Sequence, residues 1–264
     1  MSFDEGMHVG RTEGIAIVTM SNPERRNAFY PEMRRKLTAI LLDLGGKADV
    51  RAIVLTGHEG HFCAGADVSR MRLGDTRTPG ALQVRETMKE VSQLLRLIAA
   101  GSKPVIAAVE GDAFGAGLSM AAASDVVVAS RDARFGAPFT KIGILPDMGL
   151  LFTLPRRVGL SRAKQMMMLA EPMGGEEAAR IGLVDRLCEP QDALRAAIEF
   201  GGRFTAVAPV PIALIKAALA DGVTSIEDAI RIECDLQPLL SSTSDAQEGI
   251  TAFKEKRKPG FLGR

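Results

Sequence analysis

The chain has 264 residues, of which 46% are hydrophobic and 25% charged, a composition typical of a globular protein with a substantial core. Thirty-three basic against thirty-two acidic side chains leave a net charge of +1, so no overall field attracts nucleic acid or an anionic membrane. Aromatic residues make up only 5%, and no run of about 18 apolar residues occurs. We therefore expect no nucleic-acid or membrane partner, and a soluble cytoplasmic protein.

Cysteine and histidine spacing argues against disulfides and metal. Cys63, Cys188 and Cys234 are scattered and form no C-x-x-C pair, which favours buried free thiols. The three histidines all lie within the first 61 residues and show no metal-binding spacing. We expect no metal site.

Strand and helix patterns alternate through the first half of the chain, which predicts an α/β fold. The predicted elements are a strand hairpin at 7–20, a helix from Pro31 to Gly45, a strand at 52–55, a helix at 84–98, a strand at 105–109, a short helix at 115–123 and a strand at 126–128.

Strand signals nearly vanish after residue 161, and the remaining segments favour helix. These segments are 161–170, 175–181, 191–206, 210–220, 225–240 and 244–256. The Pro- and Gly-rich stretch at 74–80 is typical of a surface loop. The last third is thus expected to be a helical module.

Two glycine-rich turns follow apolar strands, at residues 60–67 and 111–117. In α/β sheets, ligands bind at the carboxyl ends of strands. Small residues let a ligand approach the backbone, and two converging amides can stabilise one negatively charged oxygen. The alternative is that the small residues only permit tight packing. Neither turn matches a nucleotide-binding motif, which disfavours NAD and ATP.

The segment around Ser119 offers a different hypothesis, because 117–121 is similar to the G-x-S-x-A elbow of serine hydrolases. Hydrolases of the α/β type place the catalytic histidine after the serine in the chain. The last histidine here is His61, which precedes it, so we disfavour a hydrolase.

An ordered set of motifs resembles the enoyl-CoA hydratase/isomerase (crotonase) superfamily. The matching pieces are Ser21-Asn22-Pro23-Glu24-Arg25-Arg26-Asn27-Ala28, Val54 to Asp67, Lys103 to Val109, Ala133-Arg134-Phe135-Gly136, Ala178 to Val184 and Ala252 to Phe261. The resemblance implies a crotonase-like spiral of ββα units at 1–200, with the acyl-CoA site, and a C-terminal helical trimerisation region at 201–264. It also implies a homotrimer or a dimer of trimers.

The resemblance further implies an acyl-CoA thioester substrate, with CoA as part of the substrate and no separate cofactor. It assigns the oxyanion hole to the amides of Ala66 and Ala116. The residues that it places around CoA are Arg25, Arg26, Ala64, Gly65, Ala66, Asp67 and Ala116. Asp67 is expected to be a structural anchor, and the bases at 256–258 are weaker candidates for contacts with CoA.

Which reaction occurs depends on the acids and bases near the substrate carbon. Hydratases of this family resemble one another in two glutamates, and the matching positions here hold Ser119 and Phe139. Asp147 is the candidate base, as in enoyl-CoA isomerases of the epoxyphenylacetyl-CoA isomerase type. Its alternative role is to cap a helix beginning near Met148, which would lower its basicity.

These observations favour an enoyl-CoA isomerase that shifts a double bond with Asp147 as base. Two alternatives remain open at this stage: a hydratase with atypical catalytic residues, and a non-catalytic acyl-CoA-binding protein.

Overall fold

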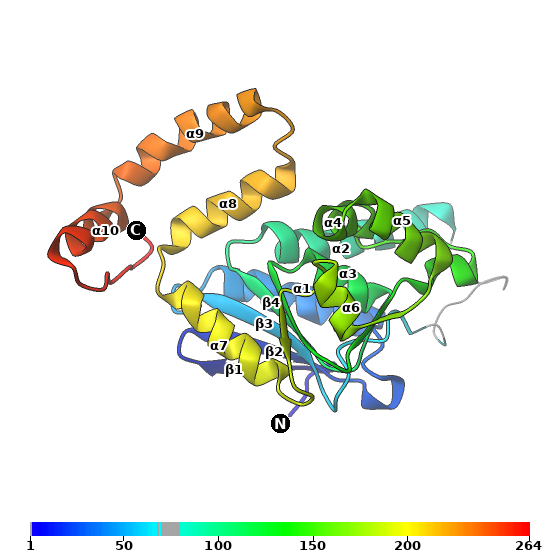
Figure 1. Cartoon of the computed structure of the whole chain (residues 1–264). Helices are drawn as coiled ribbons and strands as arrows, with labels where there is room; N and C mark the ends of the chain where they lie inside the picture. The colour runs from blue at the N-terminus through cyan, green and yellow to red at the C-terminus, as the bar shows by residue number, and fades with distance from the viewer. Residues whose placement is uncertain (1, 68, 70–79) are drawn as a thin grey trace.

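A six-stranded mixed sheet forms the centre of the molecule, and helices cover both of its faces (Figure 1). The computed structural model describes residues 2–67, 69 and 80–264. The strand order is β1-β2-β3-β4-β6-β9, in which β1 and β2 form an antiparallel hairpin and the other pairs are parallel. The strands are β1 (Met7–Thr12), β2 (Ile15–Met20), β3 (Ala52–Gly57), β4 (Val105–Val109), β6 (Val126–Ser130) and β9 (Arg186–Cys188).

A second, three-stranded sheet lies beyond the carboxyl ends of β3 and β4. It consists of β5 (Asp112–Phe114), β7 (Arg134–Gly136) and β8 (Met173–Gly174), in the order β5-β7-β8. Because β5 follows β4 after only two residues, the chain changes sheets at the second glycine turn.

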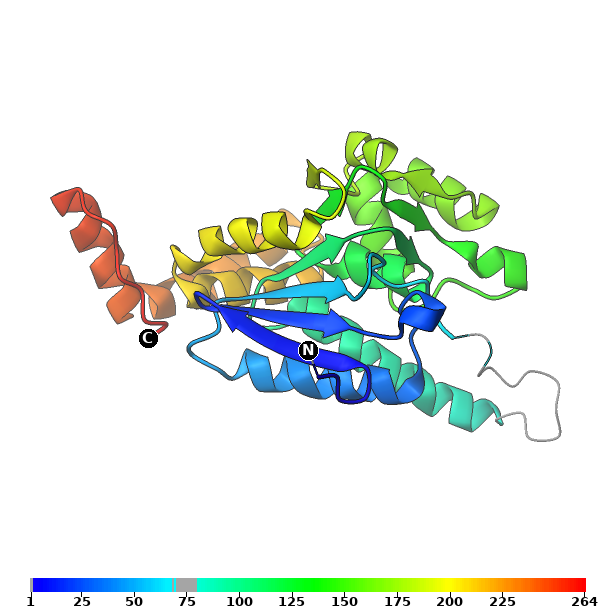
Figure 2. The same ribbon diagram turned by 90° about the horizontal axis from the view of Figure 1, so that it is seen from below.

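The two faces of the large sheet bury separate apolar clusters. One face packs against α1 (Pro31–Gly45), α2 (Ala81–Ala100) and α3 (Ala116–Ala123), and the opposite face packs against α7 (Ala193–Thr205). Figure 2 shows α1 and α2 on one side of the strands and α7 on the other. Every residue of β4 and β6 is buried, as expected for parallel strands covered on both faces.

Shorter helices connect the sheets and enclose their shared edge. These are η1 (Pro23–Arg25), η3 (Pro138–Ile142), α4 (Leu150–Val158), α5 (Leu160–Leu169) and α6 (Gly175–Arg180). Among them, η3 and the segment that leads to α4 bear on function, because they lie beside the two glycine turns.

Three C-terminal helices, α8 (Pro209–Asp221), α9 (Ile226–Ser241) and α10 (Ser244–Glu255), lead away from the core (Figure 1). The buried Lys216 attaches α8 to the core, since its ammonium donates to the main-chain oxygens of Ile98 at 3.0 Å and Lys103 at 2.8 Å and pairs with Asp125. The boundary expected at residue 200 falls inside α7, which continues to Thr205 and packs on the sheet.

The α/β prediction is confirmed, and each long helix and strand lies where its periodicity placed it. Strands β5, β7, β8 and β9 have no counterpart among the predicted elements. The predicted loop at 74–80 lies outside the described residues except for Gly80. All three cysteines are free, but the burial prediction holds only for Cys63, since Cys188 is half-buried and Cys234 exposed.

No single helix in the described ranges is both long and apolar enough to cross a membrane. Only α7 and α8 taken together, bent by 109° between them, reach that length and hydropathy.

Candidate active site

The two glycine turns meet because they leave adjacent parallel strands. β3 and β4 pair in parallel, so their carboxyl ends reach the same edge of the sheet. Beyond that edge the turns form a short ladder of their own: the amide of Cys63 donates to the oxygen of Asp112 at 2.9 Å, and the amide of Phe114 donates to the oxygen of Cys63 at 2.9 Å. This ladder fixes the first turn (60–67) against the second (111–117).

Glycine is required where the two turns touch. A Cβ atom on Gly117 would lie 2.2 Å from the main-chain oxygen of Cys63, a distance that no side chain tolerates. Gly65 has φ +104° and Gly115 has φ +50°, in the region that favours glycine. Gly117 therefore serves the tight packing of the two turns, and the approach of a ligand to the backbone stays a prediction.

Two amides point away from this ladder without a partner. Phe29 pairs with the backbone on both sides of Ala66: its amide donates to the oxygen of Gly65 at 2.7 Å, and its oxygen accepts from the amide of Asp67 at 3.0 Å. The N–H of Ala66 therefore faces the opposite way. Ala116 is the first residue of α3, where a helix leaves its amide unpaired. Neither amide makes a hydrogen bond to the described part of the chain.

Both amides border a cavity of about 300 Å³. Its walls come from both turns, the start of α1, the middle of α2, η3 and the segment before α4. Most of the lining is apolar, and among the described lining residues the acidic and basic side chains are those of Arg34, Asp67 and Asp147. The walls from α2 include Met88 and Val91. A small, largely apolar pocket with a few polar groups suits a small-molecule ligand.

Asp147 lies in this cavity with the two amides. Burial raises the pKa of its carboxyl group, which strengthens it as a base. It does not cap the next helix: α4 begins at Leu150, its N-cap is Gly149, and no side chain caps it. The capping alternative for Asp147 is therefore wrong, although the helix expected near Met148 is present and begins at Leu150.

Ser119 supports the Asp147 segment from behind the cavity wall. Its side chain is fully buried in α3, and its hydroxyl lies 3.2 Å from the main-chain oxygen of Asp147 and 3.1 Å from that of Gly115. Ser119 does not line the cavity, so its hydroxyl is not placed to attack a ligand there. His61 lies in the first turn, where its Nδ1 accepts a hydrogen bond from the amide of Asp112. This arrangement does not support the serine hydrolase alternative.

Phe139, in η3, is 6% exposed and lines the cavity. Its ring lies close to the second turn, 3.9 Å from where a Cβ on Gly115 would stand. The ring makes that part of the cavity wall apolar, and the dry local site expected from Phe139 stays a prediction.

The residues expected around CoA divide into two groups. Ala64, Gly65 and Asp67 line the cavity together with the two alanines of the amides. Asp67 also holds its own loop, since its carboxylate accepts from the amide of Ser69 at 3.1 Å.

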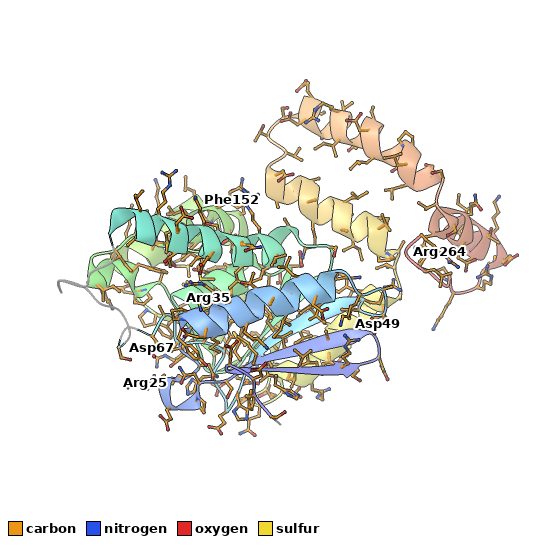
Figure 3. The ribbon with its side chains drawn as sticks, turned by 180° about the vertical axis from the view of Figure 1, so that it is seen from behind. Arg25, Arg35, Asp49, Asp67, Phe152 and Arg264 are labelled. Atoms are coloured by element: carbon orange, nitrogen blue, oxygen red, sulfur yellow. The ribbon has the colours of Figure 1, made fainter. Side chains whose placement is uncertain are left out.

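The basic residues Arg25 and Arg26 lie outside the lining. Arg26 pairs with the buried Asp112 at 2.9 Å, although its own side chain is largely exposed. Figure 3 shows Arg25 and Asp67 at the same edge of the molecule, near the start of α1.

The C-terminal bases lie far from the cavity within one chain, because α10 extends away from the core (Figure 1). Arg257 is occupied by Glu248 at 2.6 Å and Glu255 at 2.7 Å, and it holds the pKa of Glu248 down at about 2.

Arg34 is a cavity residue that the sequence did not single out. It lies on α1, and its Nη2 donates to Glu90 of α2 at 2.8 Å. Arg34 faces the cavity because of the way α1 packs against α2. Helical periodicity in the sequence does not predict that packing. Within the described residues, no group of three or more Asp, Glu, His and Cys side chains could hold a metal ion.

Comparisons with known proteins agree with the geometry. The family model described as enoyl-CoA hydratase/isomerase matches residues 10–264. A Rhodobacter capsulatus protein named "Probable enoyl-CoA hydratase" is 40% identical over 259 residues, covering 96% of each chain. The 1,2-epoxyphenylacetyl-CoA isomerase of Escherichia coli is 32% identical, with the same coverage.

Among solved structures, an enoyl-CoA hydratase from Bacillus anthracis superposes with a TM-score of 0.90 at 28% identity, covering 98% of this chain and 100% of that one. The expected crotonase-like fold is thereby confirmed.

Proposed function

Because the chain belongs to the enoyl-CoA hydratase/isomerase family, we propose that its cavity binds an acyl-CoA thioester and stabilises the enolate of that thioester. The observation that carries this proposal is the pair of unpartnered amides, from Ala66 and Ala116, that border one cavity. Removing a proton near a thioester carbonyl places negative charge on the carbonyl oxygen. Two fixed N–H donors stabilise that charge as it develops.

The reaction we propose is the migration of a double bond in an enoyl-CoA. The carboxylate of Asp147 removes a proton from C2 of a 3-enoyl thioester, and the electron pair of that C–H bond moves to the carbonyl oxygen, which gives a dienolate. The protonated Asp147 then returns its proton to C4 as the carbonyl re-forms, which leaves the double bond between C2 and C3, a 2-enoyl thioester. A single base suffices, and no water is consumed.

The other carboxylate of the cavity lining supports this assignment by contrast. Asp67 is engaged by the amide and hydroxyl of Ser69, whereas Asp147 has a pKa raised by burial. A raised pKa brings a carboxylate closer to the basicity that proton abstraction requires at neutral pH.

A hydratase is the second candidate, favoured by the printed name of the Rhodobacter capsulatus relative. Hydration needs a group that holds and deprotonates water, and in this cavity that task would fall to Asp147. The positions where hydratases of the family resemble one another hold a buried hydroxyl at Ser119 and an apolar ring at Phe139, which is why we favour the isomerase. A non-catalytic acyl-CoA-binding protein is the third candidate.

The test offers purified protein a 3-enoyl-CoA and, separately, the matching 2-enoyl-CoA, and identifies the products by mass spectrometry and NMR. We expect the 3-enoyl thioester to become the 2-enoyl thioester without a water adduct. Faster formation of a 3-hydroxyacyl thioester would identify a hydratase. Binding without turnover of either substrate would identify an acyl-CoA-binding protein.

We also propose that the CoA moiety leaves the cavity past the loop that holds Arg25 and Arg26, and that the chain forms a homotrimer or a dimer of trimers. The first is supported by the position of Arg25 at the same edge as Asp67 (Figure 3). The second is supported by the apolar side chains that α8, α9 and α10 expose.

A further inference from the structure

Arg34 introduces a positive charge into the mainly apolar part of the cavity wall formed by α1 and α2. Its neighbours in that part of the lining include Tyr30, Met88 and Val91. Only 12% of the Arg34 side chain is exposed. An arginine that is buried to this extent normally has its donors matched by acceptors.

The donors of Arg34 are only partly matched. Nη2 donates to Glu90 at 2.8 Å, while Nε is inaccessible to solvent and has no hydrogen-bond partner in the described part of the chain. Nη1 likewise makes no hydrogen bond to the described residues. If Arg34 served only to link α1 to α2, its Nη2 would be sufficient. The absence of hydrogen-bond partners for its other nitrogens in the described part of the chain would then have no explanation.

Glu90 does not fully neutralise this charge. The side chain of Glu90 is 52% exposed, so water weakens its hold on Arg34. The neighbouring Arg35 is 60% exposed and is not part of the cavity lining. The positive charge of Arg34 is thus available to an anion inside the cavity.

The position of Arg34 along α1 indicates which part of a ligand it would meet. Phe29 is hydrogen-bonded to the first turn at Gly65, and α1 begins two residues later. Four helical steps from Tyr30 carry the chain about 6 Å along the helix axis. Arg34 and the amide of Ala66 therefore line one cavity from two different elements, α1 and the first turn, so that a single ligand could contact both.

On the basis of the proposed function, we propose that Arg34 binds a carboxylate at the far end of the acyl group. The substrates would then be CoA thioesters of dicarboxylic acids. A guanidinium N–H forms a charge-assisted hydrogen bond with a carboxylate, which a plain alkyl chain cannot replace. A site built to satisfy buried polar donors rejects ligands that lack the matching acceptor.

The test measures binding of saturated thioesters by calorimetry, which requires no turnover. The probes are succinyl-, glutaryl-, adipoyl- and suberoyl-CoA, each against the monocarboxylic thioester of equal chain length, with free CoA as reference. Two variants change Arg34: Arg34→Met keeps the length and packing of the side chain, and Arg34→Lys keeps the charge but loses the planar guanidinium. Arg35→Met is the matched control. Thermal melting verifies that each variant folds.

We expect the unmodified protein to bind at least one dicarboxylic thioester about tenfold or more tightly than its monocarboxylic partner. Arg34→Met should remove this preference, Arg34→Lys should reduce it, and Arg35→Met should keep it, while affinity for free CoA stays unchanged. Equal affinity of the unmodified protein for both members of every pair would overturn the proposal whether or not the variants fold. An equal loss for all probes and free CoA in Arg34→Met would also overturn it, because Arg34 would then bind the CoA moiety.

This result is separable from the isomerase proposal. A preference for dicarboxylic thioesters without double-bond migration would reject only the isomerase, and migration without the preference would reject only the role of Arg34.

Discussion

At the residue scale, the chemistry depends on a carboxyl group that is uncharged more readily than an ordinary aspartate. Burial raises the pKa of Asp147, and the basic side chain in the described part of the cavity lining is that of Arg34, on α1. The folded protein therefore favours the protonated form of this group, whereas catalysis needs the ionised form. Function and stability place opposite demands on the same carboxyl.

This conflict predicts a pH dependence. Activity should fall as pH drops through the folded pKa of Asp147, which lies above that of an ordinary aspartate, so the acid limb of kcat/KM should appear at a higher pH than for an exposed carboxyl. A pH–rate profile measures this directly. An acid limb at the pKa of an exposed aspartate would contradict the assignment.

The same pKa shift predicts that Asp147→Asn does not destabilise the fold at neutral pH. Because the folded pKa exceeds the unfolded one, the contribution of Asp147 to stability is present below the unfolded pKa and is lost as pH rises through the folded pKa. The variant should therefore melt at the same or a higher temperature than the unmodified protein at pH 7, and the difference should shrink in acid. A lower melting temperature at pH 7 would refute this prediction.

Ser119 is expected to hold the Asp147 segment in place through its hydroxyl. One hydrogen bond of this kind contributes about 0.5–1.5 kcal/mol, so Ser119→Ala should lower kcat by up to about tenfold and change KM little. Ser124→Ala is the matched control, because Ser124 is also buried in the same region but donates only to Met120 of its own helix. Equal kcat losses in both variants would indicate a general packing effect.

At the element scale, the proposed oxyanion hole depends on two turns and on the first residue of a helix. The amide of Ala116 is available because helix α3 begins there, and proline is well tolerated at this helical position. Ala116→Pro removes the N–H, and we expect kcat to fall about a hundredfold to a thousandfold. Circular dichroism and affinity for free CoA serve as controls. A kcat within a few-fold of the unmodified enzyme would exclude this amide from catalysis.

The sequence predicts the elements that carry strong periodicity and the turns that need glycine. Helix α1 and strands β2, β3 and β4 have long apolar patterns, and the packing reason for Gly117 is visible in the run of small residues. Strands of two or three residues, such as β8, are too short to show a period.

The cavity walls could not be predicted in the same way. Arg34 and Met88 meet there only because α1 packs against α2, and that packing is a tertiary property. Asp147 could be named from its motif, but the rise in its pKa depends on burial that no local pattern encodes.

At the scale of the whole molecule, the C-terminal helices leave several large apolar side chains exposed in the single chain. Phe253 of α10 is 86% exposed, and Ile226 at the start of α9 is 69% exposed. Large exposed apolar patches mark association surfaces. The proposed trimer, or dimer of trimers, would cover them.

This predicts that Phe253→Asp shifts the protein toward smaller species, because a charge would be buried in the contact. Light scattering coupled to gel filtration measures the mass, and Lys254→Ala, a neighbouring exposed position, is the control. A monomeric unmodified protein would contradict the proposed assembly.

The central claim is that Asp147 moves a proton on a thioester whose enolate is held by the amides of Ala66 and Ala116. Its most direct test is the NMR-detected incorporation of deuterium at C2 of a 3-enoyl-CoA in deuterated buffer, for the unmodified enzyme and for Asp147→Asn. We predict incorporation with double-bond migration in the first and a loss of about a hundredfold to ten-thousandfold in the second. Exchange at an unchanged rate in Asp147→Asn, or no exchange in the unmodified enzyme across several chain lengths, would contradict it.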